Sequence, residues 1–245
     1  MCRFLAYLGP PVPLSSLVFD PTHSLLIQSH APRRMLAGSV NADGYGVAWY
    51  ADGGPVRVAG NRPLWRERDL PALLRSVRSS CVLAAVRNTS PGIVAGESGL
   101  QPVVRGGHGF VLNGFVEDFR RSVMRRMHAA LSDRRYAELE GTSDTEAVFL
   151  LALDALERGA SRSEALREAC ERTLAEAGRA GVEAMLTAAL TDGGGVSALR
   201  LGNRQRANSL FVNRDYAGGA ALASEPLDED AGWLEVEPGG VVELR

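Results

Sequence analysis

The first half of the chain consists of short apolar runs separated by turns rich in glycine and proline. Runs that are rich in β-branched or aromatic residues and bounded by turn residues are typical of β-strands. Four segments fit this description: CRFLAYL (2–8), GVAWYA (46–51), VLAAV (82–86) and FVLNGFV (110–116). Strand is therefore expected to follow strand in this half, with little helix between.

The middle of the chain changes character, because its apolar residues recur at helical spacing. Two helices are predicted, through DTEAVFLLALDALERG (144–159) and SEALREACERTLAEAG (163–178). Each is preceded by the pattern of a capping box, Ser143 with Glu146 and Ser161 with Glu164. Both helices should therefore begin at well-defined residues.

Strand patterns return after the three glycines at 193–195. The expected strands are VSALRLG (196–202), SLFVN (209–213), GAALAS (219–224) and GVVEL (240–244). Helices thus form one block between two sets of strands, which favours an α+β fold of antiparallel sheets with helices packed outside over a parallel Rossmann-like sheet. No repeat, low-complexity tract or linker divides the chain, so residues 1–245 are predicted to form a single domain.

Composition indicates an ordinary soluble protein, with 45% hydrophobic and 23% charged residues. No segment reaches the roughly 18 apolar residues of a membrane span. Pro10, Pro11 and Pro13 interrupt the N-terminal apolar run before the apolar region of a signal peptide can form. A cytoplasmic location without a membrane partner is therefore expected.

Charge and residue usage exclude several classes of function. A net charge of −2 leaves no excess of positive charge with which to bind nucleic acid. The basic stretch RRSVMRRMH (120–128) is interpreted as the solvated face of a helix. All 27 basic residues are arginines, which excludes a pyridoxal Schiff base and a Walker-type phosphate loop. The three cysteines are scattered and the four histidines lack ligand spacing, so no metal site is expected.

Cys2 stands directly behind the initiator methionine. Methionine aminopeptidases remove Met1 when the next side chain is small, and cysteine qualifies, so Met1 is expected to be removed. The new first residue would carry a thiol and a free α-amine, two groups that titrate within about one pH unit of each other. The amine can take the thiol proton, directly or through a water, so one residue supplies both nucleophile and base. Alternatively, Cys2 is only the first residue of a strand.

An acyl-transfer nucleophile also needs oxyanion donors and charged groups that orient the substrate. The Asn113-Gly114 pair can direct a side-chain amide and a main-chain N–H towards one spot, although Asn-Gly is otherwise a hairpin signal. Arg87, beside Ser90 at the end of an apolar strand, can either hold a carboxylate or be solvated. Asp144 lies in the first turn of a predicted helix, where it either supports the helix cap or holds an ammonium group.

Together these segments resemble the class II glutamine amidotransferase domain of the N-terminal nucleophile hydrolases. The hallmarks of that domain, in order, are Met-Cys, D-G-x-G, an arginine motif, Asn-Gly and Ser-Asp-x-Glu. This chain has Met1-Cys2, NADGYGVAWY (41–50), VRNTSPG (86–92), LNG (112–114) and SDTE (143–146). Each motif is weak, but five in the correct order are specific.

A narrower resemblance spans almost the whole chain and is least distinctive in the helical block. It is to the amidohydrolases of ergothioneine biosynthesis, which remove glutamate from γ-glutamyl-hercynylcysteine sulfoxide. The segments that carry it are MCRFLAYLGPPVPL, LLIQSHAPR, VNADGYGVAWY, AAVRNTSPG and ASEPLDEDAGWLEVEPGGVVEL. This resemblance implies a four-layer αββα sandwich, a small-molecule γ-glutamyl substrate and no cofactor, and it leaves the oligomeric state open.

The resemblance also implies roles for individual residues. Cys2 would be the nucleophile, with Asn113 and Gly114 as the oxyanion hole. Arg87 would bind the α-carboxylate of the γ-glutamyl group and Asp144 its α-amine.

Three further positions qualify these roles. Ser90 matches a hydroxyl position that assists. Leu112 and Ala85 stand where the family commonly has histidines, which affects efficiency and substrate fit and leaves the reaction type unchanged.

Three alternatives remain open at this point. A glutaminase subunit that delivers ammonia to a separate synthase would use the same residues, and so would another γ-glutamyl peptidase. A third alternative is an inactive binding module that keeps Met1, because a retained Met1 would acylate the amine of Cys2. For the leaving group, Trp49, Tyr50, Trp65 and Trp233 offer aromatic faces, although core packing is the expected role for most of them.

Overall fold

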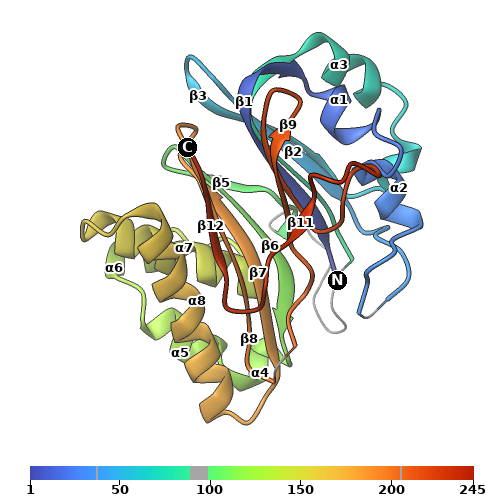
Figure 1. The fold of residues 1–245 in the computed structure, drawn as a ribbon. Helices are drawn as coiled ribbons and strands as arrows, with labels where there is room; N and C mark the ends of the chain where they lie inside the picture. Colours follow the sequence, from blue (N-terminus) through green and yellow to red (C-terminus); the bar gives the residue numbers. More distant parts are fainter. Residues whose placement is uncertain (37, 89–98, 205) are drawn as a thin grey trace.

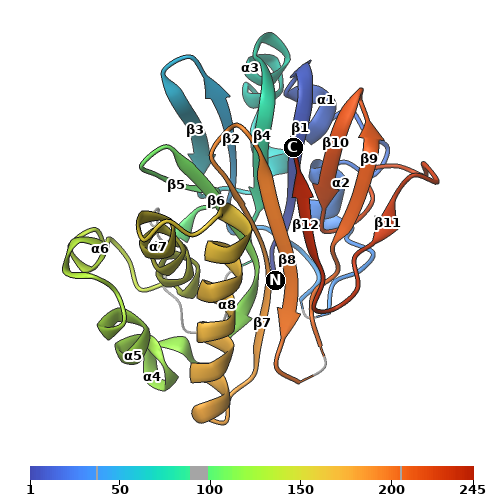
Figure 2. The ribbon, with the colours of Figure 1, turned by 60° about the vertical axis from the view of Figure 1, so that its left-hand side comes forward.

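The computed structural model describes residues 1–36, 38–88, 99–204 and 206–245. It folds them into two antiparallel β-sheets that stack on each other and carry helices on their outer faces (Figure 1). The arrangement is an α+β fold with four layers, in the order helices, sheet, sheet, helices (Figure 2). The predicted fold class is confirmed.

The larger sheet combines strands from both ends of the chain, and its order in the described residues is β11-β9-β10-β1-β4-β2-β3. The strands are β1 (Arg3–Pro13), β2 (Tyr45–Ala51), β3 (Gly54–Gly60), β4 (Arg78–Val86), β9 (Phe211–Tyr216), β10 (Gly219–Ala223) and β11 (Leu234–Glu235). Strand β1 is central, with β10 on one side and β4 on the other. The N-terminus therefore enters the middle of this sheet.

The smaller sheet has the order β12-β8-β7-β6-β5 among the described residues. Its strands are β5 (Val103–Arg105), β6 (His108–Val116), β7 (Ala184–Thr191), β8 (Val196–Gly202) and β12 (Val241–Leu244). β7 is buried along its whole length because it lies in the centre of this sheet.

Helices cover the outer face of each sheet. The larger sheet carries α1 (Ser15–Val18), α2 (Leu25–His30) and α3 (Leu70–Ser76), with the short 3₁₀ turn η1 (Leu64–Arg66). The smaller sheet carries α4 (Phe119–Ser122), α5 (Met124–Ala129), α6 (Asp133–Ala137), α7 (Asp144–Glu157) and α8 (Arg162–Arg179). Figure 2 shows α7 and α8 lying along the smaller sheet, on the side away from the larger one.

The alternation of side chains along β1 shows how the layers are held together. Phe4 and Ala6 lie in the apolar cluster between the two sheets, whereas Leu5 and Tyr7 lie in the cluster beneath the helices α1 to α3. Successive strand residues point to opposite faces, so one apolar run contributes to two cores. This double burial explains why the N-terminal run is apolar almost throughout.

The two long helices begin as predicted, but their caps differ. At α8 the capping box is complete, because Ser161 accepts from the N–H of Glu164 and the Glu164 carboxylate accepts from the N–H of Ser161. At α7, Ser143 accepts from the N–H of Glu146. The Glu146 carboxylate instead accepts from the N–H groups of residues 140 and 141 and from Arg105, so the predicted second half of this box is wrong.

Several elements were not expected from the pattern. Strand β7 is buried on both faces and so shows no alternation, although the turn residues 192–195 follow it directly, and α1 to α3 interrupt the strand-rich first half. The basic stretch 120–128 is divided between α4 and α5, which break at Val123. In the described residues, no helix is both long and apolar enough to cross a membrane.

Candidate active site

The candidate site begins where β1 enters the larger sheet. Arg3 is paired with Val86 in the antiparallel ladder between β1 and β4. Cys2 directly precedes β1 and Arg87 directly follows β4, so this ladder brings their main chains close together. The nucleophile and carboxylate-binding candidates, which are 85 positions apart, are brought together by strand pairing.

Cys2 is buried and lies against side chains from the smaller sheet. Its side chain is 7% exposed. The Nε2 atom of Gln101 lies 4.0 Å from the Cys2 Sγ atom, and the main-chain oxygen of Cys2 accepts a hydrogen bond from the Arg3 guanidinium at 2.8 Å. With Met1 in place the nitrogen of Cys2 is an amide, and burial lowers the pKa of the Met1 amine.

Asn113 and Gly114 lie within β6, opposite Thr187 and Leu186 of β7. The hairpin interpretation of this Asn-Gly pair is therefore wrong, because strand pairing continues through it. A side chain at Gly114 would collide with the main-chain oxygen of Met185, so glycine is required by the close approach of β7. The main-chain N–H of Gly114 is consequently not screened by any side chain of its own.

The Asn113 amide is wholly buried, and its neighbours determine how it is oriented. With its nitrogen towards the Cys2 main-chain oxygen (2.7 Å), its oxygen accepts from the Arg3 guanidinium (3.1 Å). In the opposite orientation the nitrogen faces only the Ser224 hydroxyl, at 3.4 Å. The first orientation satisfies both ends of the amide, and it directs the N–H₂ group towards the nucleophile residue.

Asp144 is the first residue of α7, and it ties that helix to the end of β6. Its carboxylate accepts hydrogen bonds from the N–H of Val116 (2.9 Å) and the N–H of Thr145 (2.8 Å). Among the described residues no arginine or histidine forms an ion pair with it, and burial raises the pKa of Asp144 although these hydrogen bonds oppose the shift. A buried carboxylate of this kind is suited to receive a cation from outside.

Arg87 is also buried and is held by its main chain. Its N–H donates to the oxygen of Gly44 (2.8 Å), and its oxygen accepts from the N–H of Asp43 (3.0 Å). A side chain at Gly99 would press on the Arg87 guanidinium, so the head of this arginine lies beside the segment that leads to Gln101. Ser90, the other residue predicted from this motif, lies outside the described residues.

Gln101 is a site residue that sequence reasoning missed. Its side chain accepts from the N–H of Leu112 (2.6 Å) and donates to the oxygen of Leu112 (3.0 Å) and to the Thr145 hydroxyl (3.4 Å). It thereby links Cys2 to β6 and to the start of α7. A side chain at Gly46 would collide with the main-chain oxygen of Gln101, which gives the second glycine of the D-G-x-G motif a packing role.

A second missed group lies beneath Cys2. Arg3 and Glu225 are both fully buried and form an ion pair at 2.7 Å, and His23 Nε2 lies 2.8 Å from the other oxygen of Glu225. Burial alone would raise the pKa of Glu225, but hydrogen bonds from His23 and two main-chain N–H groups, together with the charge of Arg3, lower it to about 2. A charged residue inside an apolar strand, as in CRFLAYL, was the only available signal.

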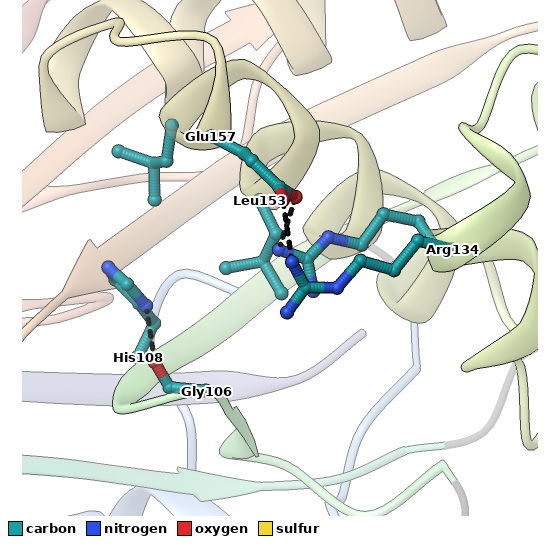
Figure 3. Close-up of a pocket in the computed structure, with 7 residues that line it drawn as sticks. Gly106, His108, Arg134, Leu153 and Glu157 are labelled. Atoms are coloured by element: carbon teal, nitrogen blue, oxygen red, sulfur yellow. Dashed lines mark hydrogen bonds and ion pairs between the residues drawn. The ribbon is translucent and has the colours of Figure 1, made fainter.

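Two surface hollows contain none of the predicted site residues. One, of about 400 Å³, is lined by His108 of β6 and by residues of α6 and α7, and Figure 3 shows its Arg134 paired with Glu157 at 2.6 Å. The other, of about 570 Å³, is lined by Tyr45, Leu100 and polar residues near the end of β3. In the described part of the chain no group of three or more His, Cys, Asp or Glu side chains could hold a metal ion.

Three of the four aromatic candidates for the leaving group make contacts within the fold, whereas Trp65 is 41% exposed and lies edge-on to His30. Tyr50 donates to the oxygens of Gly107 (3.1 Å) and Thr191 (3.2 Å). Trp233 packs on Tyr216, and Trp49 packs against the core beneath α1 to α3. Core packing is thus the role of most of these side chains, as expected.

Comparison with known proteins agrees with this geometry. Residues 14–215 match the family of class II glutamine amidotransferases, and the chain belongs to that family. It is therefore an amide-hydrolysing enzyme of this class. Two relatives named gamma-glutamyl-hercynylcysteine sulfoxide hydrolase, from Mycobacterium tuberculosis and Mycolicibacterium smegmatis, are each 34% identical over the whole of this chain and cover 93% and 96% of their own lengths.

Among solved structures, a glutamine aminotransferase class-II domain protein from Silicibacter pomeroyi superposes with a TM-score of 0.73 at 27% identity. The match covers 99% of this chain and 94% of that one. The resemblance to class II glutamine amidotransferases with an N-terminal nucleophile fold is confirmed.

Proposed function

We propose that this protein removes the γ-glutamyl group from γ-glutamyl-hercynylcysteine sulfoxide, with Cys2 as the nucleophile, as a step of ergothioneine biosynthesis. The observation that carries the proposal is a series of buried contacts around Cys2. The Asn113 amide lies 2.7 Å from the main-chain oxygen of Cys2, and Gln101 Nε2 lies 4.0 Å from Cys2 Sγ and 3.4 Å from the hydroxyl of Thr145, the neighbour of Asp144. Arg87 follows the strand that pairs with the start of β1. The full-length similarity to the two mycobacterial hydrolases supports the choice of substrate.

In this proposal, removal of Met1 frees the α-amine of Cys2, which takes the thiol proton. The sulfur bonds to the carbonyl carbon of the γ-glutamyl amide, and the oxyanion that forms is held by the Asn113 amide and the Gly114 N–H. Loss of one such donor typically slows a reaction of this kind by about 10²- to 10³-fold. The C–N bond then breaks as the amine of Cys2 returns the proton to the departing amine of hercynylcysteine sulfoxide.

The second half of the reaction hydrolyses the thioester. Water gives a proton to the amine of Cys2 and attacks the same carbon, again with the oxyanion held by Asn113 and Gly114. The C–S bond breaks, the thiol recovers its proton, and glutamate leaves. Every proton is carried by Cys2, so the proposed cycle uses no cofactor.

Recognition of the substrate rests on its glutamyl head in this proposal. Arg87 pairs with the α-carboxylate, and Asp144 pairs with the α-ammonium group. Since Asp144 is buried without a cation among the described residues, an ammonium group would supply its missing charge partner. A substrate that lacks the ammonium group would leave this carboxylate buried and unpaired, which is costly.

The test is glutamate release by purified protein, with intact mass recorded on the same sample to establish whether Met1 has been removed. We compare γ-glutamyl-hercynylcysteine sulfoxide with L-glutamine and use Cys2→Ala as the inactive variant. Cys81→Ala is the matched control, because Cys81 is a fully buried cysteine that lies between the sheets. Release from the sulfoxide that is lost only in Cys2→Ala is expected.

Other outcomes point elsewhere. Release mainly from glutamine would favour a glutaminase subunit that works with a separate synthase. No release from a sample without Met1 would contradict catalysis on these substrates and favour a binding module.

A further inference from the structure

The Arg3 guanidinium makes contacts that have no role in the reaction proposed above. Arg3 is 0% exposed, and its side chain reaches three different acceptors. It donates to Glu225 Oε1 (2.7 Å), to the main-chain oxygen of Cys2 (2.8 Å) and to the Asn113 side-chain oxygen (3.1 Å). One side chain therefore touches both the nucleophile residue and an oxyanion donor.

Glu225 holds this guanidinium in place. Its carboxylate accepts from Arg3, from His23 Nε2 (2.8 Å) and from the main-chain N–H groups of Arg33 (2.8 Å) and Arg34 (3.0 Å). Both oxygens are thus occupied by donors from three different parts of the chain. Such a saturated carboxylate leaves Arg3 little freedom to turn.

The contact between Arg3 and Asn113 has a chemical consequence. A guanidinium carries only donors, so the Asn113 oxygen must face it. The Asn113 N–H₂ group is then directed to the opposite side, towards Cys2. Without the guanidinium, only the main-chain oxygen of Cys2 (2.7 Å) would oppose the alternative orientation, in which the nitrogen faces Ser224, and that oxygen is itself held by Arg3.

We propose that Arg3, held by Glu225, is a positioning residue for the reaction: it anchors the main chain of Cys2 and sets the Asn113 amide so that its N–H₂ group faces the reacting carbonyl. This proposal rests on the proposed roles of Cys2 and Asn113 in amide hydrolysis. It does not depend on which γ-glutamyl amide is the natural substrate.

The first test is the kinetics of Arg3→Met and Glu225→Gln, with intact mass showing removal of Met1 in every sample. Each variant is expected to lower kcat at least 10-fold, with KM changed by less than threefold, because the oxyanion donor is misplaced while Arg87 and Asp144 still bind the glutamyl head. Arg3→Lys keeps the charge without the three-way contact, so its kcat should also remain low.

Matched controls come from an ion pair on the surface of α8. Arg167 and Glu171 pair at 3.1 Å, with side chains 44% and 56% exposed. Arg167→Met and Glu171→Gln are expected to keep kcat within twofold of the wild-type value. They report whether loss of any Arg–Glu pair affects the reaction.

The double variant R3M/E225Q separates positioning from folding. Breaking a buried ion pair on one side leaves an uncompensated charge, whereas removal of both charges is often tolerated. The double variant is expected to unfold at a higher temperature than either single variant and still to have a kcat at least 10-fold below wild type. A double variant with kcat within twofold of wild type would overturn the proposal.

Two further measurements keep a failure of this proposal distinguishable from a failure of the proposed function. The kinetics are repeated with L-glutamine and a γ-glutamyl anilide, so a wild-type protein that ignores the sulfoxide still tests Arg3. If no amide is cleaved, the rate of Cys2 alkylation by iodoacetamide is compared by peptide mass. Arg3→Met should change it at least threefold, because the main chain that carries the thiol loses its hydrogen bond to the guanidinium, and an unchanged rate would count against the proposal.

Discussion

Asp144 and Glu225 are two buried carboxylates of the candidate site, but their surroundings are opposite. Glu225 accepts from Arg3, His23 and two main-chain N–H groups, and its pKa is lowered to about 2. Asp144 accepts mainly from the N–H groups of Val116 and Thr145, and burial raises its pKa. One carboxylate has its full set of partners within the fold, whereas the other has no cation in the described residues.

The difference separates a charge that is paired within the fold from one that is available to a ligand. A carboxylate that is fully paired in the free protein gains nothing further from a ligand, so Glu225 contributes to the stability and geometry of the fold. A carboxylate that is buried without a cation destabilises the free protein, and it becomes favourable when a ligand supplies the cation. The fold therefore tolerates an unfavourable Asp144 where the ammonium group of a substrate is proposed to bind.

The largest expected effect is on activity in Asp144→Asn. This variant should lower kcat/KM for γ-glutamyl amides about 100-fold or more, since truncation of one partner of a buried charge pair costs about 2–5 kcal/mol. Glutamate release measures the loss, and Asp133→Asn, an exposed aspartate in the first turn of α6, is the control. A glutaryl amide, which lacks the α-amine, should lose little, and an equal loss on both substrates would contradict the pairing with the amine.

The next effect is on stability in Glu225→Gln. The pKa of Glu225 is lowered from an ordinary value of 4.5 to about 2, so its stabilising contribution is complete above about pH 4.5 and is lost as pH falls towards 2. The variant should lose about 3 kcal/mol of unfolding free energy at pH 7, on the scale of about 1.4 kcal/mol per pKa unit. Urea unfolding at pH 7, 5 and 3 should show the gap narrowing on acidification, whereas a constant gap would argue against this role.

A smaller effect of opposite sign is expected for the stability of Asp144→Asn. Because the folded-state pKa of Asp144 is raised, the wild-type protein loses stability as pH rises from the ordinary carboxyl value through the raised one, by at most about 1.4 kcal/mol per pH unit. The asparagine variant lacks this loss, so its stability relative to wild type should improve with rising pH. Thermal unfolding between pH 4 and 8 checks the trend. The reverse trend would mean that the charged form of Asp144 stabilises the folded protein, as that of Glu225 does.

The smallest effect is expected for Thr145→Val. The Thr145 hydroxyl lies at the limit of hydrogen bonding from Asp144 Oδ1 (3.5 Å) and from Gln101 Nε2 (3.4 Å). Its removal should lower kcat/KM only about two- to fivefold, because the main-chain donors to Asp144 remain. Thr173→Val, in a buried position of α8, serves as the control. A loss as large as that of Asp144→Asn would show that this hydroxyl, and not the carboxylate charge, is decisive.

Local patterns predicted much of the fold. The spacing of apolar residues in 144–159 and 163–178 depends only on neighbours along the chain, and α7 and α8 form there. β7 was missed because a strand buried on both faces has no alternation to recognise. The cap of α7 was only half predicted, because Glu146 is drawn to Arg105, a residue 41 positions away.

The sequence likewise predicted only part of the candidate site. Cys2, Arg87, Asn113, Gly114 and Asp144 were found as motifs in a known order, and the structure brings their elements together. Ser90 lies outside the described residues, so its role stays a prediction.

The amino-acid sequence by itself determined which reactive groups the protein contains: a thiol at the second position, an Asn-Gly pair, an arginine and an aspartate. It also determined the helices and strands that have a recognisable period. Only the tertiary structure decided which groups became partners. Arg3 meets Glu225 across 222 positions, and Gln101 meets Cys2 across 99. Such contacts depend on strand register and on the stacking of two sheets, and neither leaves a periodic signal in the neighbouring residues.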